Sequence, residues 1–277
     1  MNVGELLRRY ANGERNFPQS DLRGAFLGGI NLSGANLRES DLSGANLNNA
    51  NLTRTNLREC NLSRASLRAN LQEANLIQTD LSLADLSGAN LQDVSLRAAN
   101  LSQANLIGAN LSHAILHETE LGQANLSRAI LIQASLCRAK LKKAIMIQTN
   151  LQGANLSNAT LVDADLQKAD LSDSTLHGIN GMNVNATEAS FCRAQLSSSN
   201  LANIILRRAN LREVVMTWTT LRGADLSEAK LYKAKLCWSN LTGANLTNAV
   251  LLDANLDEAN LHNAILQGTV MPNAGNP

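Results

Sequence analysis

Hydrophobic and polar positions along this chain repeat with a period of five. A leucine, occasionally Phe or Met, recurs at every fifth residue from Phe17 to Leu67, and again from Leu71 to Met271. We call this position the centre of each repeat. A small residue, usually Ala, stands two residues before the centre, and Asn, Asp or Ser usually stands directly before it. The consensus is therefore A-(N/D)-L-x-x.

A period of five fits neither an amphipathic helix nor a straight strand. A helix turns about 100° per residue, so steps of five would spread the leucines around its whole circumference. A strand alternates its faces with a period of two, so an odd step would send successive leucines to opposite sides. Only a bend in every repeat keeps all the centres inward, and Asn, Asp, Ser and Gly are the residues that favour such bends. The chain is predicted to wind as a polygon with sides of five residues.

The number of sides follows from a resemblance and not from the period. Runs such as SDLSG, ADLSG and SNLTG resemble the pentapeptide-repeat family over nearly the whole chain from about Arg15. The resemblance implies an all-β fold, a right-handed quadrilateral β-helix with four repeats in each coil of twenty residues. About thirteen coils rising about 4.8 Å each would then make a rod.

The period breaks once by a deletion. The step from Leu67 to Leu71 is four residues and not five, so one outward residue is missing beside Arg68. We expect a tighter corner there, after which the frame resets.

The segment GINGMNVNATEASF, residues 178–191, breaks the pattern in another way. Its centres are the tiny Gly181 and Ala186, while the normally small positions before them hold Ile179 and Val184. Large and small residues have exchanged places, which roughly conserves the inward volume. An in-frame coil is therefore the favoured interpretation, with Phe191 filling space beside Ala186, and a bulged coil is the alternative.

The sequence divides into three parts. Residues 3–11 have apolar residues at helical spacing and end at an Asn-Gly pair, so residues 1–14 are predicted to be a helical cap on the first coil. This opening resembles that of cyanobacterial members of the family. Residues 15–271 form the β-helix, and residues 272–277 are expected to be a frayed tail.

Composition and charge exclude several classes of function. Twenty-four Lys and Arg face twenty-three Asp and Glu, with a net charge of +1. Nucleic-acid binding calls for a basic surface, and a DNA mimic that inhibits or protects a topoisomerase calls for an acidic one, so the near-neutral charge disfavours both. No apolar run reaches membrane-span length and no signal peptide is apparent, so a cytoplasmic location without membrane contact is expected.

The sequence offers no recognisable catalytic or cofactor motif. The four histidines pair with no nucleophile, and His113 and His117, which flank one corner, more often belong to a solvated corner than to a metal site. Cys60 falls at an inward position and the other three cysteines fall outward and far apart, so four free thiols are expected. We predict that the protein is not an enzyme and has no cofactor or metal, although an unrecognised enzyme remains an alternative.

Two tryptophans form the most distinctive surface feature. Trp218 and Trp238 are twenty residues apart, so they should lie one above the other on adjacent coils and form a platform for a protein partner. The alternative is that the rings only cover the flank of the β-helix. Val215 and Lys235 are predicted to lie near the platform, with Tyr232 on the preceding side.

The leading hypothesis is a non-catalytic interaction module, in which a rigid rod presents flat faces to a protein partner, with a regulatory role as one possibility. The DNA-mimic topoisomerase inhibitor is the disfavoured alternative. The carboxyl-terminal coil has no cap, so a homodimer through that end is a further hypothesis.

Overall fold

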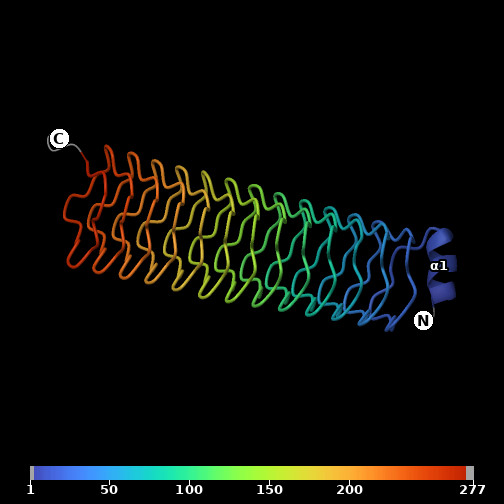
Figure 1. The fold of residues 1–277 in the computed structure, drawn as a ribbon. Coiled ribbons are helices and arrows are strands. Elements are labelled where there is room, and N and C mark those ends of the chain that lie inside the picture. The colour runs from blue at the N-terminus through green and yellow to red at the C-terminus, as the bar shows by residue number, and fades with distance from the viewer. Residues whose placement is uncertain (1–2, 273–277) are drawn as a thin grey trace. The chain divides into compact units, whose positions relative to one another are not determined.

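The computed structural model describes residues 3–272, and the chain divides into two compact units, Met1–Lys140 and Leu141–Pro277. Within each unit the backbone forms a quadrilateral β-helix, in which every fifth residue makes a bridge to the neighbouring coil (Figure 1). The one helix of the described residues, α1 (Val3–Ala11), lies at the amino-terminal end. The predicted fold class is confirmed.

The interior of both units is filled by the residues that the repeat predicts. The centres, such as Leu47 and Leu226, are fully buried, and so are the small residues two positions before them, Ala45 and Ala224. Each buried leucine contributes about 1.5–3 kcal/mol. Where Ser or Thr replaces the inward Ala, its hydroxyl bonds a carbonyl oxygen, as Thr55 Oγ1 does to Leu32 O at 3.0 Å. Buried polar side chains therefore stay satisfied.

Neighbouring coils are joined by parallel bridges between residues twenty apart. Asn46 N donates to Ala25 O of the preceding coil at 2.9 Å, and Leu47 N donates to Ser66 O of the following coil at 2.8 Å, so each side binds both neighbouring coils. The same alternation recurs in the second unit, for example from Leu201 N to Thr220 O at 2.8 Å. This ladder fixes which residues of different coils share a column.

Corners form two residues after each centre, where the backbone turns into the left-handed region. Glu39 has φ of 59° and Gly44 has φ of 65°, and the turn closes with hydrogen bonds such as Ala45 N to Leu42 O at 3.0 Å. A turn with φ above zero at its third residue favours Gly or Asn there. Asn or Asp before the centre adds a local bond, as Asn31 Oδ1 accepts from Ser33 N at 3.0 Å.

The predicted short corner is confirmed. Bridges change from a separation of twenty to nineteen where they cross it, as in Asn51 to Asn70 and Ser66 to Asp85. Ala69 N bonds Leu67 O, two residues back, at 2.7 Å, instead of the usual carbonyl three residues back. The corner has no residue in the left-handed region, because the residue that would occupy it is the one deleted.

Residues 178–191 form an in-frame coil, as predicted, and do not bulge. Ile179 and Val184 are 5% and 2% exposed, and both therefore point inward. Bridges of twenty residues pass through this coil without interruption, from Thr160 to Asn180 and from Asn180 to Asn200. The exchanged large residues therefore pack inside the core, and the coil keeps its frame.

The two ends of the described chain differ. Helix α1 buries Leu6 completely, and Tyr10 Oη donates to Ser33 O at 2.9 Å. At the other end, Ile265 and Leu266 are 53% and 40% exposed. Of the predicted tail, residues 273–277 lie outside the described residues. Between Val3 and Pro272 no helix has the length and apolar character needed to cross a membrane.

Candidate functional site

The two tryptophans of the second unit stack on each other at one corner. Their ring centroids are 5.1 Å apart and the ring planes differ by 5°. Trp218 is 63% exposed and Trp238 is 51% exposed, so much of each indole faces solvent. We call this pair the indole corner.

The repeat explains why the two rings meet. Each tryptophan stands two residues after a buried centre, Met216 or Leu236, in the left-handed region with φ of 59° and 61°. A bulky residue in that region costs about 1–2 kcal/mol, whereas an aromatic pair gains about 0.5–1.5 kcal/mol beyond its buried area. Asn158, three coils before Trp218 in the same column, makes the same turn without an aromatic ring. The turn itself therefore does not require tryptophan.

The residues predicted near the platform lie on two sides of the β-helix. Val215 and Lys235 are bridged on neighbouring coils, on the side of the β-helix that leads into the indole corner. Tyr232 lies on the preceding side, with the corner at Lys233 between, and Lys233 Nζ stands 5.1 Å from the centroid of its ring. The contact between Lys233 and Tyr232 also raises the pKa of the lysine. Tyr232 thus belongs to a neighbouring surface.

The other three corners of the second unit pair their own side chains from coil to coil. On one, Arg193 forms two bonds of 2.7 Å to Asp173, and the pKa of that carboxyl is lowered by the guanidinium. On another, Arg208 Nε lies 2.9 Å from Glu228 Oε2. On the third, Asn183 Nδ2 donates to Asp163 Oδ1 at 3.0 Å. Compared with these ladders, the indole corner leaves more of its surface for an outside molecule.

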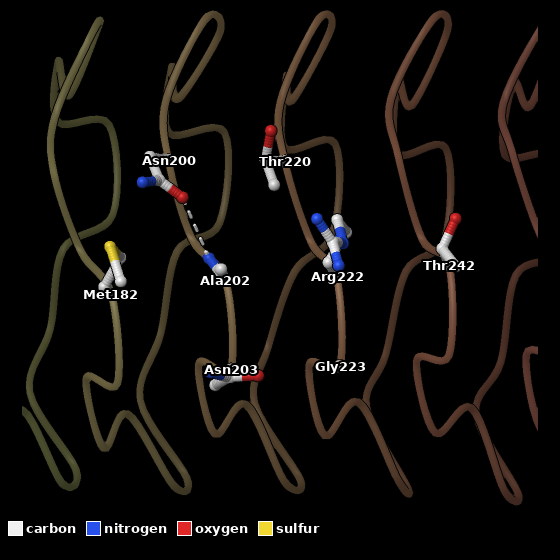
Figure 2. A pocket seen from close by; sticks show the side chains of 8 residues that line it. All are labelled: Met182, Asn200, Ala202, Asn203, Thr220, Arg222, Gly223 and Thr242. Atoms are coloured by element: carbon white, nitrogen blue, oxygen red, sulfur yellow. Dashed lines mark hydrogen bonds between the residues drawn. The ribbon is translucent and has the colours of Figure 1, made fainter.

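A hollow that sequence reasoning missed lies on the side that follows the indole corner. The chain passes from Trp218 through buried Thr219 to Thr220, which lines a hollow of about 760 Å³. Figure 2 shows its lining side chains on neighbouring coils, where small residues leave room between larger ones. The residues that line it are Met182, Asn200, Ala202, Thr220, Arg222 and Thr242, with Asn203 and Gly223. In the sequence, the small residues Ala202 and Gly223 next to the large Arg222 indicate this hollow.

The histidines and cysteines occupy the positions that the register predicts. His113 stands at a left-handed corner, and His117 Nε2 lies 2.6 Å from Ser135 Oγ. All four cysteines are free thiols. Cys60 is buried where Ser or Thr often stands, bonds Leu37 O at 2.9 Å, and has its pKa raised to about 11 by burial. Within residues 3–272, no three His, Cys, Asp or Glu side chains form a group that could hold a metal ion.

Comparison with known proteins agrees with this geometry. The family model described as pentapeptide repeats matches overlapping stretches from residue 16 to 178, and further stretches from 182 to 228 and from 229 to 268. No curated protein sequence matches the chain.

Among solved structures, the chain is similar to HetL, a pentapeptide repeat protein involved in heterocyst differentiation regulation from the cyanobacterium Nostoc sp. strain PCC 7120. The identity is 31%, both chains are covered in full, and the TM-score is 0.46. It is also similar to a pentapeptide repeat protein from the thylakoid lumen of Arabidopsis thaliana, at 31% identity over 41% of this chain and 69% of the other, with a TM-score of 0.17. QnrB1, a plasmid-mediated fluoroquinolone resistance protein, matches at 14% identity over 93% of this chain and 92% of its own, with a TM-score of 0.35. With the repeat present along most of its length, the chain belongs to the pentapeptide repeat family.

Proposed function

We propose that this protein is a non-catalytic interaction module that binds a protein partner through the indole corner and the adjoining residues Val215 and Lys235. The observation that carries the proposal is the exposed, parallel stack of Trp218 and Trp238. Stacked indoles present a large rigid apolar area that loses little conformational entropy on binding, which is why tryptophan is enriched at interface hot spots. Tyr232, on the preceding side, extends this surface.

The surroundings of the stack support this role. Charged side chains on one neighbouring corner and on the opposite corner already satisfy one another in ladders, so a partner gains little by pairing with them. The left-handed backbone of the indole corner is better suited to Asn or Gly, so the stability of the turn does not account for two tryptophans. A binding role gives both rings a function that the fold alone does not.

The test replaces both indoles with a residue that suits the turn. Trp218→Asn/Trp238→Asn should keep the circular dichroism spectrum and lose the partner in affinity purification from the native cell extract, because the apolar platform is gone. Glu213→Asn is the matched control, since Glu213 occupies the preceding corner with φ of 56°. It should retain the partner.

One outcome contradicts the proposal directly. If the folded double variant retains every protein that the unchanged chain retains, the tryptophans only cover the flank and the binding surface lies elsewhere. A protein lost equally with Glu213→Asn would point to a general surface effect and would also contradict the indole corner.

We further propose a homodimer through the carboxyl-terminal coil. Its centre Leu266 and its outward Ile265 are exposed, whereas the first coil carries α1. Two copies that meet at their last coils would form a closed symmetric pair, because α1 on the first coil prevents that coil from receiving the last coil of another copy. Leu266→Glu should convert a dimer into a monomer in sedimentation, while the double tryptophan variant should leave it intact. A monomer at all concentrations of the unchanged protein would refute the homodimer.

The absence of catalysis, of cofactors and of nucleic-acid or membrane partners remains a prediction from the sequence, as does the cytoplasmic location. None of these is needed for the two binding proposals above.

A further inference from the structure

The hollow beside the indole corner contains one charged side chain. Arg222 lies between Ala202 and Thr242 in a row across neighbouring coils (Figure 2). Among residues 3–272 no carboxylate forms an ion pair with Arg222, in contrast to Arg193, Arg207 and Arg208 of the same unit. The only formal charge that lines the hollow is therefore a cation free to pair with an incoming carboxylate.

The floor of the hollow cannot add a strand, because its backbone groups are already bonded. Leu201 N donates to Thr220 O at 2.8 Å, and Leu221 N donates to Asn240 O at 2.7 Å, so the coils on either side use these groups. Recognition in the hollow has to come from side chains. Besides Arg222, the lining offers the Thr220 hydroxyl and the amide of Asn200.

The dimensions of the hollow fit a short extended segment. Its lining runs from Met182 to Thr242, residues that occupy equivalent positions on four successive coils. With coils spaced about 4.8 Å apart, this length of about 14 Å matches four or five residues of extended chain. Trp218 stands at the corner two residues before Thr220, so an apolar side chain of the same segment could lie on the indole.

We propose that the hollow binds an extended acidic peptide segment of the protein partner, in which an Asp or Glu pairs with Arg222 and a neighbouring apolar side chain packs on the indole corner. This inference rests on the proposed function and names the chemistry of its partner. A carboxylate against a guanidinium forms a charge-assisted, often bidentate pair that gives both strength and orientation. A basic segment is disfavoured, since it would leave Arg222 facing a like charge.

The test uses displayed random decapeptides selected on the intact protein. Selected sequences should share an Asp or Glu with an apolar residue close by, and synthetic copies should bind more weakly as salt is raised. Arg222→Gln should weaken binding about tenfold or more, because a hydrogen bond to a charged group is lost. Changing the acidic residue of the peptide to its amide should weaken binding to the unchanged protein but add little in Arg222→Gln.

Arg212→Gln is the matched control. Arg212 is an exposed arginine of the same coil on a different side, and it too has no ion pair to a carboxylate within residues 3–272. It should change the affinity by less than about twofold if Arg222 acts locally. Equal weakening by both variants would mean a general charge effect and would overturn the inference.

The outcomes separate this inference from the proposed function. Peptides without an acidic residue that bind, and that lose binding with Trp218→Asn/Trp238→Asn, would overturn the acidic segment and leave the indole corner standing. Peptides that bind both the unchanged protein and the double tryptophan variant equally would contradict the proposed function as well. Failure to select any peptide would overturn the idea that the hollow takes a linear segment.

Discussion

The short corner at Leu67–Leu71 and the coil of residues 178–191 both break the repeat, and they do so in different ways. At the short corner a residue is lost from the outside, and the bridges crossing it shift from twenty to nineteen while the centres on both sides stay buried. In the coil of residues 178–191 no residue is lost, and Ile179 and Gly181 exchange sizes while the bridges keep their spacing of twenty. The deletion at the short corner changes the bridge spacing but leaves the core unchanged. The exchange in residues 178–191 changes the core residues but leaves the bridge spacing unchanged.

The difference shows where this fold is tolerant. A corner is exposed and has few packing partners, so its length can change by one residue. The interior is close-packed, and a change there has to be matched by its neighbour. Packing near Gly181 is tight. A Cβ at that position would lie 2.8 Å from Leu201 Cδ2, and the void beside Gly181 has a volume of only about 10 Å³.

Insertion of one glycine should give the largest contrast between the two regions. Between Arg68 and Ala69 it restores a five-residue repeat with Gly in the left-handed position, so the free energy of unfolding should change by less than about 1 kcal/mol. Between Asn180 and Gly181 it turns inward residues outward along that side, and the loss should exceed about 4 kcal/mol. Urea unfolding followed by circular dichroism measures both. A large loss at Arg68 would mean that the short corner is required and not merely tolerated.

Restoring the consensus sequence in the coil of residues 178–191 should give the next largest effect on the free energy of unfolding. Ile179→Ala alone should lower the free energy of unfolding by about 2–5 kcal/mol, because it leaves a cavity. Gly181→Leu alone should cost about 1–3 kcal/mol through overpacking against Leu201. The double variant reads Ala-Asn-Leu and should cost less than the sum of the two, with a coupling of about 0.5–3 kcal/mol. Additive losses would show that the exchanged sizes do not compensate each other.

The ion pair at the short corner should give the smallest effect. Arg68 Nη2 lies 2.6 Å from Asp85 Oδ2. Burial alone would raise the pKa of Asp85, but hydrogen bonds from Ser87 and Arg68 outweigh it and the pKa is lowered. A lowered pKa in the folded state contributes stability above the unfolded pKa of about 3.9, and that stability is lost as pH falls through the folded pKa.

Arg68→Ala should therefore reduce the free energy of unfolding at pH 7 by only about 0.2–1 kcal/mol, since the Arg68 side chain is 59% exposed and solvent screens its charge. The difference from the unchanged protein should shrink as pH falls below about 3.9. Thermal unfolding at pH 7 and pH 3 measures it. A difference that grows on acidification would contradict the assigned direction of the pKa shift.

Much of the fold could be predicted from the residues because the repeat is redundant. The period of five required a bend in each repeat, and the family resemblance supplied four sides, so the burial of Ile179 and Val184 could be anticipated from size alone. The same register placed Trp218 above Trp238, and the rings stack. It also placed Tyr232 on the preceding side, and the corner at Lys233 lies between that side and the one leading to Trp238.

The hollow beside Trp218 shows what the sequence could not supply. Its shape depends on how far Arg222 and Met182 project beside Ala202, which is a property of side-chain conformation on four coils at once. The pairing of Arg193 with Asp173, and the absence within residues 3–272 of a carboxylate paired with Arg222, likewise depend on which side chains reach one another in space. The sequence by itself determined which residues point inward and which share a column, because backbone geometry converts the period directly into position. Only the tertiary structure decided which exposed groups satisfy each other and which remain open to a ligand, because that depends on side-chain reach and packing between coils.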